Sequence, residues 1–87
     1  MSVDSLLEIY IKNNDYTEMI KKINYVNQNG QNLLHLMVIL KKAHKIDWLN
    51  TTFPRETMVQ LYNQKDNFGK QPWEYGGFHW RNLSLEA

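Results

Sequence analysis

Residues 27–40 read NQNGQNLLHLMVIL and combine a turn, a helix cap and an apolar helix. The dipeptide Asn29-Gly30 is typical of a tight turn, because both residues readily take positive φ angles. Asn32 is a favourable N-cap, since its side chain accepts a hydrogen bond from a free amide of the first helical turn. From Leu33 to about Lys42, apolar residues occupy nearly the whole helix circumference instead of one stripe. Such a helix has to be covered on both sides, so we expect packed helices before and after it.

Two short amphipathic helices are predicted before this stretch. The first follows a cap at Asp4 or Ser5, and its apolar residues recur at helical spacing: Leu6, Ile9 and Tyr10. The second starts at Asp15, which has the spacing of a capping box with Glu18. Its apolar face contains Tyr16, Met19, Ile20 and Ile23. We expect these two helices to form an antiparallel hairpin.

The part of the chain after the apolar helix is less regular. Residues 43–53 lose the periodic pattern, and we interpret them as an ordered connector packed by Ile46, Trp48 and Leu49. Pro54 at a first-turn position starts another helix, which ends near Asn63 and buries Met58, Leu61 and Tyr62. A second turn follows at 66–69, and residues 71–75 then predict about one helical turn, which Gly76-Gly77 ends.

The order of turn, glycine, polar cap and helix thus occurs twice, with Gly30 and Gly69 39 residues apart. This order resembles the ankyrin repeat, in which a Gly-bearing turn precedes the signature Thr-Pro-Leu-His-x-Ala. Residues that match the family pattern are Gly30 and Gly69 at the turn glycine, Asn32 and Gln71 at the capping threonine, Leu34 and Trp73 at the core leucine, and His35 at the histidine. Leu33 departs from the motif proline, and the family period of about 33 residues requires an insertion, which we place in 43–53.

The resemblance implies an all-α fold, a short ankyrin-like solenoid of stacked helical hairpins with about two and a half units. Residues 1–24 would form an N-terminal capping hairpin, 27–63 a central unit with an insertion, and 66–87 a truncated C-terminal unit. The resemblance also implies that the turn tips meet the partner. The partner-binding residues expected at the tips are Phe68, Asn29, Gln31 and Lys70, and among these Phe68 is the sharpest candidate.

Composition excludes several classes of protein. The 87 residues carry a formal net charge of +1, which favours neither a strongly cationic nucleic-acid binder nor an acidic mimic of DNA. With no cysteine, the chain has neither disulfides nor thiolate metal ligands. The longest apolar run is far shorter than the ~20 residues that cross a bilayer, and Asp4 and Glu8 do not fit a signal peptide. We therefore expect a cytoplasmic protein, in its own cell or in an infected host cell.

No motif for chemistry is present in the sequence. His35, His44 and His79 fit no metal-ligand spacing, and no glycine-rich phosphate loop precedes a helix. We expect no enzyme activity, no cofactor and no metal. The prediction for His35 is structural, a hydrogen bond to the backbone of a neighbouring loop, as the resemblance implies.

Two sets of residues leave alternatives open. The first set consists of lysines at the predicted helix ends: Lys21, Lys22, Lys41, Lys42 and Lys45. They either complement helix dipoles or form a basic edge for phosphate or for an acidic partner. The second set lies near the C-terminus: Trp73, Tyr75, Phe78, Trp80 and Arg81. These residues either close the core or anchor a partner, because aromatic clusters serve both purposes.

The leading interpretation is a protein–protein interaction module that binds a partner protein and inhibits or redirects it. A compact phage or bacterial inhibitor of the anti-defence or immunity type would suit so short a chain. The exposed ends of the array could also serve a homodimer. The alternative is a nucleic-acid-associated helical domain that uses the lysine edge and its aromatic residues, although the near-neutral charge argues against it.

Overall fold

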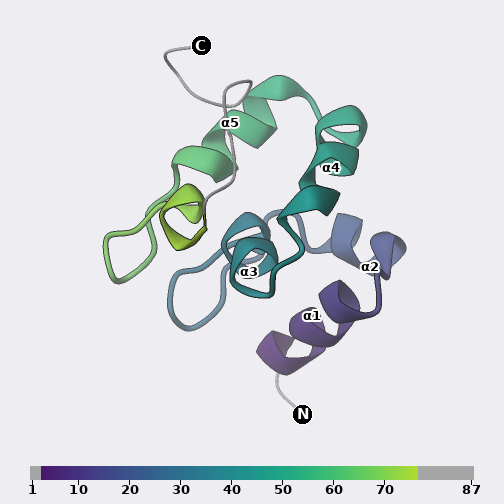
Figure 1. Cartoon of the computed structure of the whole chain (residues 1–87), viewed down its shortest axis with the longest axis horizontal. Helices are drawn as coiled ribbons and strands as arrows, with labels where there is room; N and C mark the ends of the chain where they lie inside the picture. Colours follow the sequence, from purple (N-terminus) through teal and green to yellow (C-terminus); the bar gives the residue numbers. More distant parts are fainter. Residues whose placement is uncertain (1–2, 77–87) are drawn as a thin grey trace.

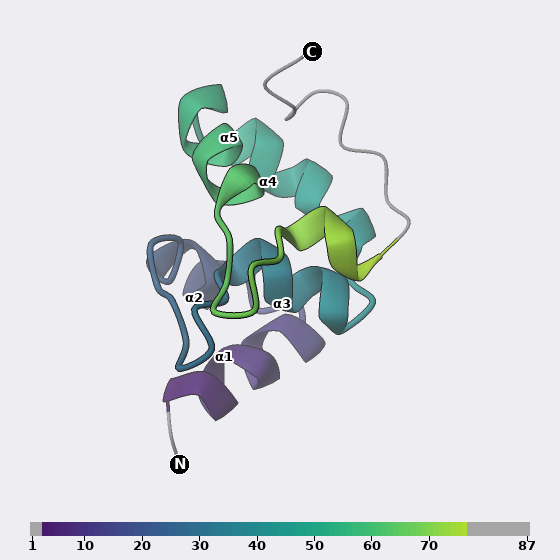
Figure 2. The same cartoon turned by 90° about the vertical axis from the view of Figure 1, so that its left-hand side faces the viewer.

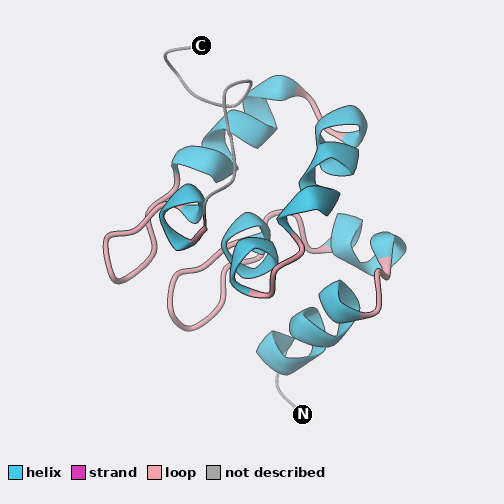
Figure 3. Ribbon diagram, viewed as in Figure 1, coloured by secondary structure: helices cyan, strands magenta, loops and turns pink. Residues whose placement is uncertain are grey.

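Helices joined by loops and turns make up the described chain, residues 3–76, in the computed structural model (Figures 1 and 3). The α-helices are α1 (Val3–Lys12), α2 (Tyr16–Lys21), α3 (Leu33–Ile39), α4 (Ile46–Thr52) and α5 (Arg55–Asn63). Two 3₁₀ helices, η1 (Ala43–Lys45) and η2 (Pro72–Tyr75), complete the order. Within residues 3–76 there is no strand, so the predicted all-α class is confirmed. None of these helices has the length and apolar character that a bilayer crossing requires.

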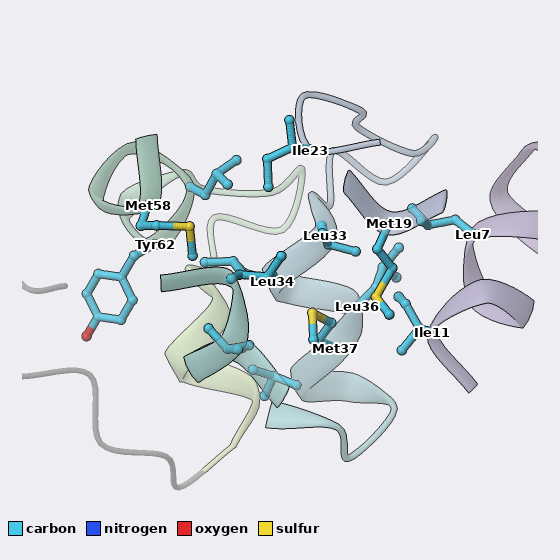
Figure 4. Close-up of a cluster of buried hydrophobic side chains, with 14 residues drawn as sticks. Leu7, Ile11, Met19, Ile23, Leu33, Leu34, Leu36, Met37, Met58 and Tyr62 are labelled. Carbon is cyan, nitrogen blue, oxygen red and sulfur yellow. The ribbon is translucent and has the colours of Figure 1, made fainter. Parts of the chain in front are cut away.

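Helix α3 lies at the centre of the core, as its apolar circumference predicts. All six residues from Leu33 to Val38 are buried. Leu7, Ile11 and Met19 from α1 and α2 point toward the Leu36 side of α3, whereas Met58 of α5 lies on the Leu34 side (Figure 4). Helix α3 ends at Ile39, three residues before the predicted end near Lys42, because Lys41 turns the chain with φ +62°.

The first two helices pack on each other, as expected, but the buried face of α1 is not the predicted one. Helix α1 begins at Val3, so the predicted cap at Asp4 or Ser5 is wrong, and both residues lie in the first turn. Leu7 and Ile11, four residues apart, are buried in the core, whereas Ile9 is exposed. In α2, Asp15 Oδ1 accepts from Glu18 N at 3.4 Å, and Glu18 pairs with Lys21 at 3.2 Å. The predicted cap of α2 is therefore present.

Residues 43–52 are helical, so the expected absence of a regular element in this segment is wrong, whereas the expected packing by Ile46, Trp48 and Leu49 is confirmed. Ile46 and Leu49, three residues apart, are fully buried on one face of α4. Trp48 packs on Tyr16 with ring centroids 4.4 Å apart, which joins α4 to α2. No side chain caps the start of α4, and two threonines end it. The helix therefore depends on tertiary packing, which periodicity over so few residues does not reveal.

Leu34→Ala should lower the free energy of unfolding by about 2–5 kcal/mol, because it leaves a cavity at a fully buried site. Ile39→Ala is the matched control in the same helix, since Ile39 is 39% exposed. Urea denaturation of both variants measures the difference. Equal, small losses would contradict the central position of α3.

Candidate functional site

Two five-residue loops project from the same end of the molecule (Figures 1 and 2). The first loop, residues 27–31, precedes α3, and the second loop, residues 66–70, precedes η2. Asn27 shapes the first loop. Its N–H donates to Gln31 O at 2.9 Å, and its Oδ1 accepts from the amides of Asn29 and Gln31, each at 2.9 Å. The side chain of the first residue thus holds the loop backbone, as Asn and Asp do in turns.

Asp66 makes the same set of hydrogen bonds in the second loop. Its N–H donates to Lys70 O at 2.9 Å, and its Oδ1 accepts from the amides of Phe68 and Lys70, each at 2.9 Å. The fourth residue of each loop is a glycine with positive φ, +74° at Gly30 and +76° at Gly69. The two loops therefore share the same hydrogen bonds and the same glycine conformation. The Asn or Asp three residues before each glycine, which holds the loop, is not among the predicted structural residues.

The two loops contact each other side by side. Asn67 N donates to Asn29 O at 2.8 Å, and Asn67 Nδ2 donates to Gln28 O at 3.0 Å. A Cβ atom added to Gly30 would lie 2.6 Å from Asn67 Oδ1 and 2.9 Å from Asn67 N. Gly30 is thus required both for its φ angle and for this close approach, whereas nothing lies within 4 Å of the same position at Gly69. We call residues 27–31 and 66–70 together the paired-loop surface.

Asn32 links the start of α3 to the end of α5. The residue is fully buried, and its Oδ1 accepts from His35 N at 3.1 Å, which confirms the predicted cap. Its Nδ2 donates to Leu61 O and to Gln64 Oε1, both at 2.8 Å. One side chain therefore caps α3 and also holds the last turn of α5 against it.

His35 links α3 to the second loop. Its Nε2 lies 2.9 Å from Lys70 O, the loop-backbone contact that the sequence predicts. Because a carbonyl oxygen only accepts, we assign the hydrogen to Nε2, and Nδ1 then accepts from Asn32 N at 3.1 Å. Burial of the ring lowers the pKa of His35 below its ordinary value of 6.5, and the bond to Lys70 and the nearby Asp66 and Glu74 only partly oppose this.

Asp66, the first residue of the second loop, has a buried carboxylate. Only 6% of the residue is exposed, and Tyr75 donates its hydroxyl hydrogen to Asp66 Oδ2. Burial alone would raise the pKa of Asp66, but the hydrogen bonds from Tyr75, Lys70 and Phe68 together lower it. Burial and the neighbouring carboxylate raise the pKa of Tyr75. Oδ1 of this carboxylate thus accepts the two loop amides, and Oδ2 accepts the hydroxyl of Tyr75 in η2.

Several of the predicted partner-binding residues are exposed in the structure. Phe68 is 65% exposed at the tip of the second loop, and Asn29 and Lys70 are also exposed. Tyr75 is partly buried, and Lys70 Nζ lies 5.3 Å from the centroid of its ring. Phe78, Trp80 and Arg81 lie outside the described residues.

Two predicted positions need correction. Gln31, expected at a tip, is only 7% exposed, because its Oε1 accepts from Asn27 Nδ2 inside the first loop. Trp73, expected in the core, is 42% exposed, and its Nε1 donates to Gln71 Oε1 at 2.7 Å. The preceding Pro72 is fully buried in its place.

The lysines of the proposed basic edge lie on several elements. Lys21 pairs with Glu18 in α2, Lys41 and Lys42 follow the end of α3, and Lys45 lies in η1. Among residues 3–76, no group of three or more His, Asp or Glu residues is arranged to hold a metal ion. A hollow of about 490 Å³ beside α5 is lined by amides and two apolar residues: Asn24, Val26, Gln60, Leu61, Asn63 and Gln64.

Comparison of the chain with protein-family models, with curated proteins and with solved structures finds no match. The geometry of the paired-loop surface is therefore the basis for the functional argument.

Gly30→Ala should destabilise the protein more than Gly69→Ala does. Both changes place a side chain at positive φ, which costs about 1–2 kcal/mol. Only the change at Gly30 also displaces Asn67 and its two hydrogen bonds to the first loop, which should add at least about 1 kcal/mol. Urea denaturation of the two variants measures this difference, and equal losses would mean that the loops do not touch.

The free energy of unfolding should fall as the pH drops below about 6.5. Because the pKa of His35 is lower in the folded protein, the unfolded chain takes up the proton first, and stability is lost as the pH falls toward the folded pKa. The lowered pKa of Asp66 acts in the same direction, but only near and below its ordinary value of 3.8.

Denaturation curves collected between pH 7 and pH 5 check this prediction. His35→Gln should flatten the pH dependence, whereas the control His44→Gln, at an exposed residue, should keep it. An NMR titration of the His35 ring in the unmodified chain gives a second measurement that does not depend on how well the variant folds. A ring that is protonated near pH 6.5 or above would contradict the prediction.

Proposed function

We propose that this chain is a small binding module that attaches its paired-loop surface to another protein and thereby inhibits or redirects it. The observation that carries the proposal is the exposure of Phe68, 65%, at the tip of a loop whose backbone is held by Asp66. Single exposed apolar residues are common on protein surfaces. An aromatic side chain on an already ordered loop is a better anchor, because less conformational freedom is lost on binding.

The neighbouring contacts support the same surface. The second loop is tied to the first loop through Asn67 and to α3 through His35. Loops that a rigid scaffold positions in this way commonly carry binding residues. The exposed Trp73, only a few residues after the second loop, adds a second large side chain on the same segment.

We further propose that the architecture is a short ankyrin-like array of about two and a half units, 1–24, 27–63 and 66–87. Three observations support it. The two loops form the same hydrogen bonds at an interval of 39 residues, they contact each other, and His35 after the first loop reaches the backbone of the second. An array of this kind presents its turn tips in a row, which is the arrangement that the paired loops have.

Affinity capture from a lysate of the source cells tests the proposed function. Phe68→Ala should leave the midpoint of thermal unfolding nearly unchanged, because the ring is largely outside the core, and should lose a stoichiometric protein partner that the unmodified chain retains. Ile9→Ala is the matched control, an exposed apolar residue on α1 that should retain the partner.

A large loss of stability in Phe68→Ala would place this ring in the core and remove the anchor. Recovery of nucleic acid in place of a protein would support the alternative nucleic-acid function. Equal recovery of one protein by the unmodified chain and by Phe68→Ala would move the binding surface elsewhere.

A further inference from the structure

The charged side chains near Phe68 differ in exposure, since its two neighbouring lysines are exposed and the carboxylate of Asp66 is buried. Lys65 and Lys70 are both exposed; Lys65 directly precedes the second loop, and Lys70 is its last residue. The hydrogen bond from Asp66 N to Lys70 O closes the base of this loop, so both lysines lie at the base and Phe68 lies at the tip. Within residues 3–76, neither lysine pairs with a carboxylate. Lys70 Nζ lies 5.3 Å from the centroid of the Tyr75 ring, and both lysines remain exposed, so their positive charge can still meet a partner.

The two carboxylates of this region, Asp66 and Glu74, differ in exposure, and both accept hydrogen bonds. Asp66 is 6% exposed, and its oxygens accept hydrogen bonds from Phe68, Lys70 and Tyr75. Glu74 is exposed, but its Oε2 accepts from Gln71 N at 2.6 Å as part of the cap of η2. The first loop contributes amide side chains and no charged residue. The paired-loop surface thus offers an aromatic ring, amides and Lys70, and its one carboxylate, Asp66, is buried; the exposed Lys65 precedes it along the chain, and the exposed Glu74 follows it.

We infer that the partner presents an apolar pocket bordered by Asp or Glu side chains, a conclusion that rests on the proposed function. Phe68 would fill the pocket, and Lys65 and Lys70 would face the carboxylates. Complementary charges of this kind steer the encounter and select the partner, while the buried ring supplies most of the affinity. Affinity should consequently fall as salt is added, because exposed charge pairs are screened.

A nucleic acid fits this surface less well. Binding to a phosphate backbone requires several cations along its path, and its affinity comes largely from them. Here there are only Lys65, before the second loop, and Lys70, at its end; the first loop has no cation, and the whole chain has a net charge of only +1. A protein pocket needs no more than the ring and the two lysines, so the observations favour a protein.

Selection from a library of random linear peptides, with the whole chain as bait, tests this inference without a known partner. Recovered peptides should be enriched in Asp and Glu next to apolar residues, and Phe68→Ala should abolish their binding. Lys70→Glu should weaken their binding about tenfold at low ionic strength, equivalent to about 1.4 kcal/mol. Lys41→Glu is the matched control, since it makes the same charge change at an exposed residue beyond the opposite end of α3.

The outcomes separate this inference from the proposed function. Peptides that need Phe68 but show no acidic enrichment, and bind Lys70→Glu as well as the unmodified chain, would overturn the acidic partner and leave the binding surface in place. The absence of any Phe68-dependent peptide would overturn both. Binding of single-stranded oligothymidine that is lost in Phe68→Ala would assign the surface to nucleic acid and also overturn the inference.

Discussion

Two buried polar side chains at the start of α3 hold the two halves of the molecule together. Asn32 donates to Leu61 O and Gln64 Oε1 of the α5 end, and His35 bonds to Lys70 O of the second loop. A buried group that loses its partner costs about 1–3 kcal/mol, so these bonds strongly favour one relative position of the two segments. Apolar contacts alone would allow the second loop to slide along α3, because such contacts are not directional. The hydrogen bonds therefore determine where the two loops meet.

Hydrogen bonds within and between the two loops explain why the loops are ordered although they project from the core. Within each loop the first side chain, Asn27 or Asp66, satisfies the amides two and four residues later. Between the loops, Asn67 satisfies two carbonyl oxygens of its neighbour. Most of the backbone groups named here make hydrogen bonds within the protein. The loops can therefore adopt this conformation without a bound partner. Phe68 is therefore exposed on a loop that is already ordered, and this supports its proposed role as an anchor.

The sequence predicts those parts that depend on residues close together along the chain. The cap at Asn32, the turns at Gly30 and Gly69 and the apolar face of α5 all follow from spacings of a few residues, and each is present. Helix α4 was missed because Ile46, Trp48 and Leu49 define its face only through packing on other helices. The burial of Gln31 and the exposure of Trp73 likewise depend on contacts that local patterns do not specify. In the candidate site, the exposure of Phe68 could be predicted, because the tip of a turn is exposed in almost any packing of the helices.

The position of Gly76 accounts for the outward orientation of Trp73. A Cβ atom at Gly76 would lie 2.8 Å from Val38 Cγ1, so the chain leaves η2 in close contact with the last turn of α3. At its beginning, the same segment is held to α3 by the bond between His35 and Lys70. Pro72 is fully buried between these two attachments, and the next residue of the 3₁₀ helix, turned by about 120° from it, is exposed. Trp73 is thus exposed by the same contacts that order the second loop, which places two large aromatic side chains, Phe68 and Trp73, on one firmly attached segment.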